Sequence, residues 1–157
     1  LEFCPLYIVF AFVGELTCYH SMVVDVFLSH AWRFHPEWTL LSGIIERNFS
    51  NLVRNFSLPW HDPAISPSSE YGNGFLTRQI EVQIMPVEFV FMITELFDTA
   101  SNMKWLEKEL DFAKNHSKQV IYVSSRSLEI SINPDTNNSQ SNSTSFEEFL
   151  TSKISNC

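Results

Sequence analysis

Three short stretches of the chain carry side chains whose types could do chemistry. They supply hydroxyl, imidazole, indole and carboxylate groups, and they are Ser29, His30, Trp32, Trp60, Asp62, Trp105 and Glu109. On a helix, Trp105 and Glu109 would lie one turn apart on the same face, with Phe112 continuing it. Taken alone, this spacing is typical of a packing aromatic residue and a solvated charge that pairs with nearby lysines.

Four familiar kinds of site are not indicated. His30, His35, His61 and Asp62 could suggest a metal centre, but His and Asp at strand ends are ordinary loop and capping residues, so we expect no metal. Ser29 and His30 would point to opposite faces of a continuing strand, which argues against a catalytic triad. The sequence has neither a GxGxxG box after its first strand nor a GxxxxGK[ST] box, so we expect neither a dehydrogenase-type dinucleotide site nor a P-loop.

Strands and helices alternate after residue 21. Apolar runs typical of strands cover residues 23–28, 56–60, 87–94, 119–123 and 128–132. Proline in a strand limits its pairing, so the second of these is expected to be short.

Helices are predicted between these strands. His35–Trp38 is typical of a helix start, and residues 61–74 are expected to form a long loop before the next helix. That next helix has an apolar stripe made by Leu76, Ile80 and Ile84. A later helix is expected to be capped at Ser101 or Asn102, and its predicted buried face consists of Met103, Leu106, Leu110 and Ala113.

This order predicts an α/β fold, a flavodoxin-like three-layer sandwich with a mainly parallel sheet of four to five strands. Ligands of such sheets bind beyond the carboxyl ends of the strands. By that rule the candidate ligand-binding residues are 29–32 after the first strand, 60–62 after the second, and Thr94 with Glu95 after the third.

Four segments are expected along the chain. Residues 1–21 form an apolar extension, whose charge-free run at 3–14 is shorter than the roughly 18–20 residues that span a bilayer. Residues 22–132 form the main domain, and 133–145 form a polar flexible linker. Residues 146–157 form a short helix that docks back on the domain or meets a partner, with Ser145 and Glu148 as its capping box.

Composition narrows the function classes. The 157 residues are 45% hydrophobic, which is enough for a core and excludes wholesale disorder. The net charge of −8 argues against nucleic-acid binding, which normally leaves a basic surface. The cysteines are odd in number and scattered along the chain, at Cys4, Cys18 and Cys157. This pattern predicts free thiols in a reducing compartment, so we expect a cytoplasmic protein without a membrane span.

Three motifs resemble those of one family. Asp25–Ala31 (DVFLSHA) is similar to the first-strand box of TIR (Toll/interleukin receptor) domains, and Trp105–Leu110 (WLEKEL) resembles the Trp-x-x-x-Glu motif of TIR domains that cleave NAD. Trp60–Asp62 falls where this family often has an aromatic residue followed by an acid. The tracts at Trp60–Pro63 (WHDP) and Ile84–Val87 (IMPV) are closest to the TIR-like subfamily that includes the signalling component of the Thoeris anti-phage system. The similarity covers residues 23–123.

The resemblance implies a TIR-like fold and an enzyme, an NAD nucleosidase or cyclase, that acts in bacterial defence. It implies that Glu109 is the catalytic carboxylate and that NAD is the substrate, so no cofactor is expected. The implied substrate-binding residues are Ser29, His30, Trp32, Trp60, Asp62 and Trp105. It also implies self-association and a downstream effector that reads a nucleotide signal.

One departure from the family concerns the residues after the first-strand box. Many NAD-cleaving relatives carry a charged residue there, whereas this chain has Trp32 and then Arg33. Two other functions stay open: a TIR-like interaction module without catalysis, and a base-exchanging enzyme similar to nucleoside deoxyribosyltransferases, which is also built around a carboxylate.

Overall fold

The computed structural model describes residues 23–29, 36–57, 69–98, 100–132 and 144–155. Its five-stranded sheet has the order β2-β1-β3-β4-β5. The parallel strands are β1 (Val24–Leu28), β2 (Val53–Asn55), β3 (Phe89–Ile93) and β4 (Gln119–Val123), and β5 (Ile130–Ser131) runs antiparallel to β4.

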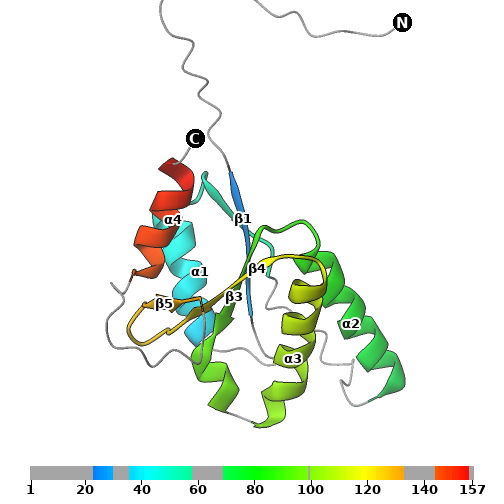
Figure 1. Ribbon diagram of the computed structural model, residues 1–157. Coiled ribbons are helices and arrows are strands. Elements are labelled where there is room, and N and C mark those ends of the chain that lie inside the picture. Colours follow the sequence, from blue (N-terminus) through cyan, green and yellow to red (C-terminus); the bar gives the residue numbers. More distant parts are fainter. Residues whose placement is uncertain (1–22, 30–35, 58–68, 99, 133–143, 156–157) are drawn as a thin grey trace, which may run out of the picture.

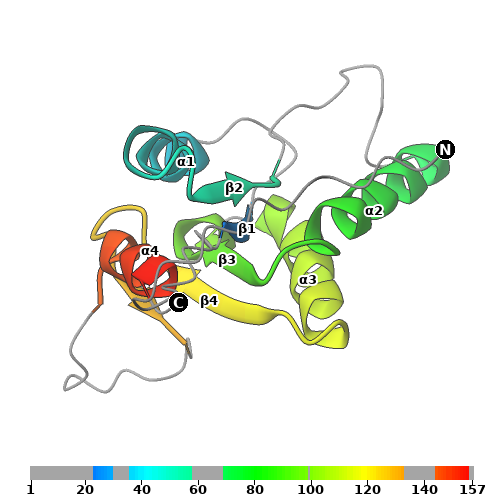
Figure 2. The same ribbon diagram turned by 90° about the horizontal axis from the view of Figure 1, so that it is seen from above.

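Helices cover both faces of this sheet. Helices α1 (Pro36–Asn48) and α4 (Phe146–Ser155) lie on one face, and α2 (Glu70–Ile84) and α3 (Ala100–Asn115) lie on the other (Figures 1 and 2). The fold is the predicted flavodoxin-like three-layer α/β sandwich, with β5 as an antiparallel addition. We call the edge of the sheet where β1 to β4 end the C-terminal edge; it is the lower edge in Figure 1.

The hydrophobic core lies on both faces of β1 and β3. All five residues of β3 are buried, as expected for a central strand of a parallel sheet. On one face, Phe146 and Phe149 of α4 pack edge-on against Phe91, with ring centroids 5.0 and 5.8 Å apart. The helix predicted after the polar segment therefore docks back on the domain and is part of its core.

The predicted capping box of α4 is present. The Ser145 backbone N–H donates to Glu148 Oε2 at 2.9 Å, and the Glu148 N–H donates to Ser145 Oγ at 3.2 Å. These bonds satisfy two backbone donors at the start of the helix. They also fix the direction in which the chain enters the core at Phe146.

Strand β2 lies earlier in the chain than predicted. The aromatic run at 56–60 was expected to form it, but the strand is Val53–Asn55, and residues 58–60 lie outside the described part of the chain. Val53 is buried, and Arg54 is in register with Asp25 of β1. The two side chains form a bidentate ion pair of 2.6 and 2.7 Å, so Asp25 supports the neighbouring strand β2.

Helix α2 begins before the end of the predicted loop. Ser69 caps it by accepting a hydrogen bond from the Gly72 N–H at 2.9 Å, so residues 70–74 are helical. Glycine disfavours a helix, which is why Gly72 and Gly74 indicated a loop, but this cap and the packing of α2 on α3 outweigh that cost. The rest of the predicted loop, residues 61–68, lies outside the described residues.

Two further differences concern the ends of elements. Helix α3 begins at Ala100, so Ser101 and Asn102 lie within it and do not cap it as predicted. A 3-10 helix, η1 (Thr94–Asp98), follows β3 directly. None of the helices in the described ranges is long and apolar enough to cross a membrane.

Candidate functional site

The face of α3 that carries Trp105 and Glu109 is buried. Trp105 is 8% exposed and Glu109 is 1% exposed. The predicted buried face of this helix is therefore wrong in part: it left out Trp105 and Glu109, and it included Leu110, which is only partly buried. Helix α3 packs on the sheet with one side and on α2 with the next, so its buried surface is wider than a single stripe.

Lys108 joins this face to helix α2. Its ammonium donates hydrogen bonds to Asn73 Oδ1 at 2.7 Å and to Thr77 Oγ1 at 2.8 Å, and it lies 4.7 Å from the centroid of the Trp105 ring. Burial lowers the pKa of the Lys108 ammonium, and the charge of Lys104 lowers it further. Lys108 was not among the predicted site residues, although its place three residues after Trp105 puts it beside that ring on a helix.

Ser29 stands at the C-terminal edge and connects two strands. Its backbone N–H donates to the Phe91 carbonyl at 2.7 Å, and its Oγ accepts from the Ile93 N–H at 2.7 Å. Ser29 is fully buried. The hydroxyl that we predicted to bind substrate therefore closes the junction between β1 and β3.

Glu95 anchors the neighbouring strand end. Its carboxylate accepts hydrogen bonds from the turn after β4, where the Ser125 and Arg126 N–H groups lie at 3.0 and 3.3 Å. Burial raises the pKa of Glu95, but these hydrogen bonds and one from the Ser124 hydroxyl outweigh it and lower the pKa to about 2. The sequence predicted Glu95 at a strand end. The serines that follow β4 are the sequence feature that could have indicated its hydrogen-bond donors.

A third network supports the end of β2. The indole Nε1–H of Trp38 donates to Ser57 Oγ at 2.8 Å, and that hydroxyl donates to Asn55 Oδ1 at 2.6 Å. These bonds tie the first turn of α1 to the residues that follow β2. This network was not predicted, because the sequence indicated Trp38 only as part of a helix start.

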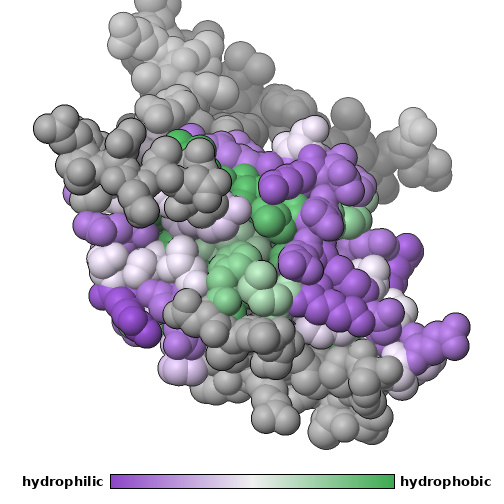
Figure 3. Space-filling model, turned by 60° about the horizontal axis from the view of Figure 1, so that its bottom comes forward, coloured by the Kyte–Doolittle hydropathy of each residue, from purple (hydrophilic) through white to green (hydrophobic). Residues whose placement is uncertain are grey.

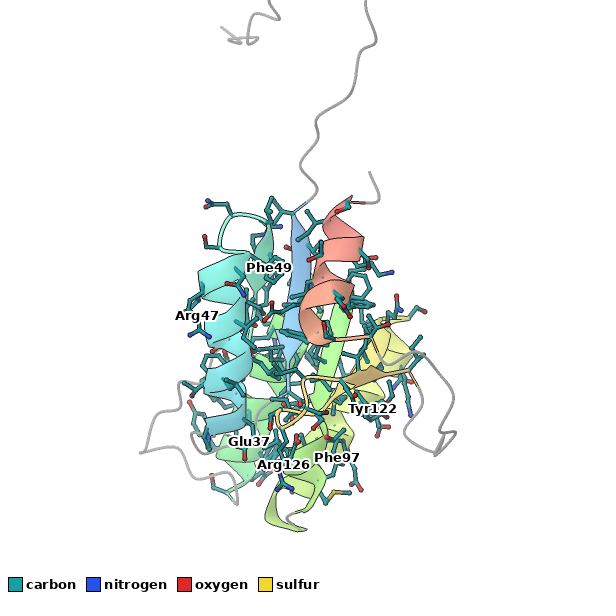
Figure 4. The ribbon with its side chains drawn as sticks, turned by 90° about the vertical axis from the view of Figure 1, so that its left-hand side faces the viewer. Glu37, Arg47, Phe49, Phe97, Tyr122 and Arg126 are labelled. Carbon is teal, nitrogen blue, oxygen red and sulfur yellow. The ribbon has the colours of Figure 1, made fainter. Side chains whose placement is uncertain are left out.

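The C-terminal edge thus gathers polar groups from several elements. Figure 4 shows Glu37 of α1, Phe97 of η1 and Arg126 at this end of the fold, whereas Phe49 lies towards the opposite end. Figure 3 views the fold from this end, where an apolar area is bordered by hydrophilic side chains. Helix α3 starts at this edge, so Trp105 lies closer to it than Glu109 does.

Four of the predicted site residues are not in the part of the chain that the structure describes. His30, Trp32, Trp60 and Asp62 lie outside the described residues. Of the predicted set, the structure brings Trp105 and Glu109 together on one helix face, and it puts Ser29 at the end of β1. Within the described ranges, no group of three or more His, Cys, Asp or Glu side chains could hold a metal ion.

Comparisons with known proteins give no match to this chain: no protein-family model fits it, and no curated protein or solved structure matches it significantly. The similarity to TIR domains therefore stands on the sequence motifs at 25–31, 60–62 and 105–110.

Proposed function

We propose that this protein is a TIR-like enzyme that cleaves the bond between nicotinamide and ribose in NAD. The observation that carries the proposal is the packing of Trp105 and Glu109 on one buried face of α3. A carboxylate is costly to bury, and such groups concentrate at functional sites. The resemblance of Trp105–Leu110 to the Trp-x-x-x-Glu motif of NAD-cleaving TIR domains assigns that function to the pair.

The chemistry needs little more than a placed negative charge. Nicotinamide in NAD is already a cationic leaving group, so its departure needs no strong general acid. Positive charge develops on the ribose as the bond breaks, as in glycoside cleavage. The Glu109 carboxylate stabilises this charge and orients the ribose hydroxyls, while the Trp105 indole stacks on the ligand and excludes water.

Two products are compatible with this step. Attack by water on the ribose gives ADP-ribose, and attack by a group of the same molecule gives a cyclic ADP-ribose isomer. The resemblance to the Thoeris signalling component favours the cyclic product and a role in bacterial anti-phage defence. In that role the protein acts in the cytoplasm, and an effector protein reads the nucleotide signal.

The proposal includes an activation step. Glu109 is only 1% exposed and Trp105 only 8% exposed in the single chain, so both have to be uncovered before they can contact NAD. Self-association or a bound trigger supplies this change, as the resemblance to TIR domains implies. The activity per molecule is therefore expected to rise with protein concentration.

The same burial favours a second candidate, an interaction module without catalysis. In such a module Trp105 and Glu109 would serve only to pack α3 against its neighbours. A base-exchanging enzyme similar to nucleoside deoxyribosyltransferases has no further observation in its favour.

Incubation of the pure protein with NAD, over a wide range of protein concentration, separates these functions. Chromatography is expected to detect nicotinamide together with ADP-ribose or a cyclic isomer, at a rate per molecule that rises with concentration. Base exchange with an added nucleoside and no loss of NAD would favour the transferase. Unchanged NAD at every concentration would favour the interaction module.

A further inference from the structure

Two lysines share the ring of Trp105. The Lys108 ammonium lies 4.7 Å from the ring centroid and the Lys104 ammonium lies 5.7 Å from it. The two lysines are four residues apart on α3, a spacing at which like charges destabilise a helix. The contacts with the Trp105 ring therefore hold two like charges close together on one helix.

No acid in the described ranges neutralises this pair. The ion pairs there join Arg54 with Asp25 and Arg78 with Glu81. Glu107 follows Lys104 by three residues, as Asp111 follows Lys108, and this spacing allows an ion pair on a helix. Neither pair forms, although the chain as a whole carries a net charge of −8.

Lys108 is also held in place. Asn73 and Thr77 of α2 accept two of its three ammonium protons, and both acceptors are neutral oxygens. The charge of Lys108 is thus oriented but not cancelled. An oriented ammonium with a remaining donor is a suitable partner for a phosphate oxygen.

We infer that Lys104 and Lys108 form a binding subsite for the phosphate groups of a ligand that binds beside Trp105. This inference rests on the proposed function: it assigns the diphosphate of NAD to the lysines and the ribose to Glu109. The order along α3 fits the assignment, because Lys104 precedes Trp105 by one residue and Glu109 follows it by one turn. An anion bound here relieves the repulsion between the two ammonium groups.

The subsite is tested by calorimetric titration of the full chain with inorganic pyrophosphate at low salt. The double variant Lys104→Gln, Lys108→Gln is expected to bind at least tenfold more weakly than the wild type. Lys114→Gln removes the same charge from an exposed position in the last turn of α3, and its affinity is expected to stay within twofold of the wild type. Equal affinities for the wild type and the double variant, or no binding to the wild type, would overturn the subsite. So would an equal loss in Lys114→Gln, because that would be an effect of net charge alone.

Lys108→Gln also removes the hydrogen bonds to α2, so Lys104→Gln is the safer single variant. No hydrogen bond of Lys104 to a described residue is lost with it, and we expect it to weaken pyrophosphate binding about threefold or more without a change in melting temperature. In NAD cleavage it is expected to raise KM and leave kcat near the wild-type value. Cleavage with an unchanged KM would overturn the subsite and leave the proposed function intact. Lysine-dependent pyrophosphate binding without NAD cleavage would uphold the subsite and overturn the proposed function.

Discussion

The Glu95 carboxylate accepts a hydrogen bond of 2.7 Å from the Ser124 hydroxyl, which links the residues that follow β3 and β4. Glu95 lies in η1, and Ser124 is the first residue after β4. Because β3 and β4 are neighbours in the sheet, this bond fixes the C-terminal edge between them. Helix α3 follows η1 in the chain and contacts it, so the position of Trp105 depends on this edge.

Acid is expected to destabilise the fold through Glu95. Burial raises its pKa, but hydrogen bonds from residues 124–126 and from its own N–H lower the pKa from 4.5 to about 2. A folded-state pKa below the unfolded value gives stability that is complete above pH ~4.5 and is lost as the pH falls towards ~2. After a discount for solvent screening of this partly exposed group, we expect a loss of about 1–2 kcal/mol.

Urea unfolding at pH 6 and pH 3 checks this expectation. Glu95→Gln should be less stable than the wild type at pH 6. The difference should be smaller at pH 3, because at that pH the wild type has lost part of the stability that its ionised Glu95 carboxylate provides. A difference of the same size at both pH values would contradict the role given to the ionised carboxylate.

Ser29→Ala is expected to lower the free energy of unfolding by about 1–3 kcal/mol, because it leaves the buried Ile93 N–H without its acceptor. Ser155→Ala, at an exposed site in α4, is a suitable control and should change stability by less than about 0.5 kcal/mol. Chemical denaturation measures both. A Ser29→Ala variant of wild-type stability with a raised KM for NAD would instead favour the substrate-binding role predicted from the sequence.

Phe146→Ala is expected to lower the free energy of unfolding by about 3–5 kcal/mol, because the ring is fully buried against Phe91. Ile132→Ala removes an apolar side chain that is 72% exposed and should change stability by less than about 0.5 kcal/mol. Equal melting temperatures for the two variants would contradict the inclusion of α4 in the core.

The sequence predicts the layers of this fold better than the packing of its helices. Apolar runs such as 119–123 mark strands clearly, and β4 has those bounds. Strand β2 was misplaced because Arg54 and Asn55 made its residues look polar, whereas pairing with β1 buries Val53 and brings Arg54 next to Asp25. Local spacing could not reveal such a contact between residues far apart in the sequence.

The candidate site could also be predicted only in part, because local spacing does not show contacts between separate elements. The four-residue spacing put Trp105 and Glu109 on one face, which the helix retains. The burial of Glu109 could not be predicted, because it depends on how α2 and the sheet enclose α3. The bridge from Lys108 to Asn73 and Thr77 likewise requires the packing of two helices.

The rate of NAD cleavage by Glu109→Gln, compared with the wild type and with Glu107→Gln, tests the central proposal most directly. Glutamine keeps the shape of the buried side chain and removes its charge, so we expect a loss of about 100-fold or more with a melting temperature within about 2 °C of the wild type. Glu107 is exposed on the same helix, and Glu107→Gln should cleave NAD at the wild-type rate. Wild-type activity in Glu109→Gln would contradict a catalytic carboxylate at this position, and a loss of activity that follows a large drop in melting temperature would assign Glu109 to the packing of α3 instead.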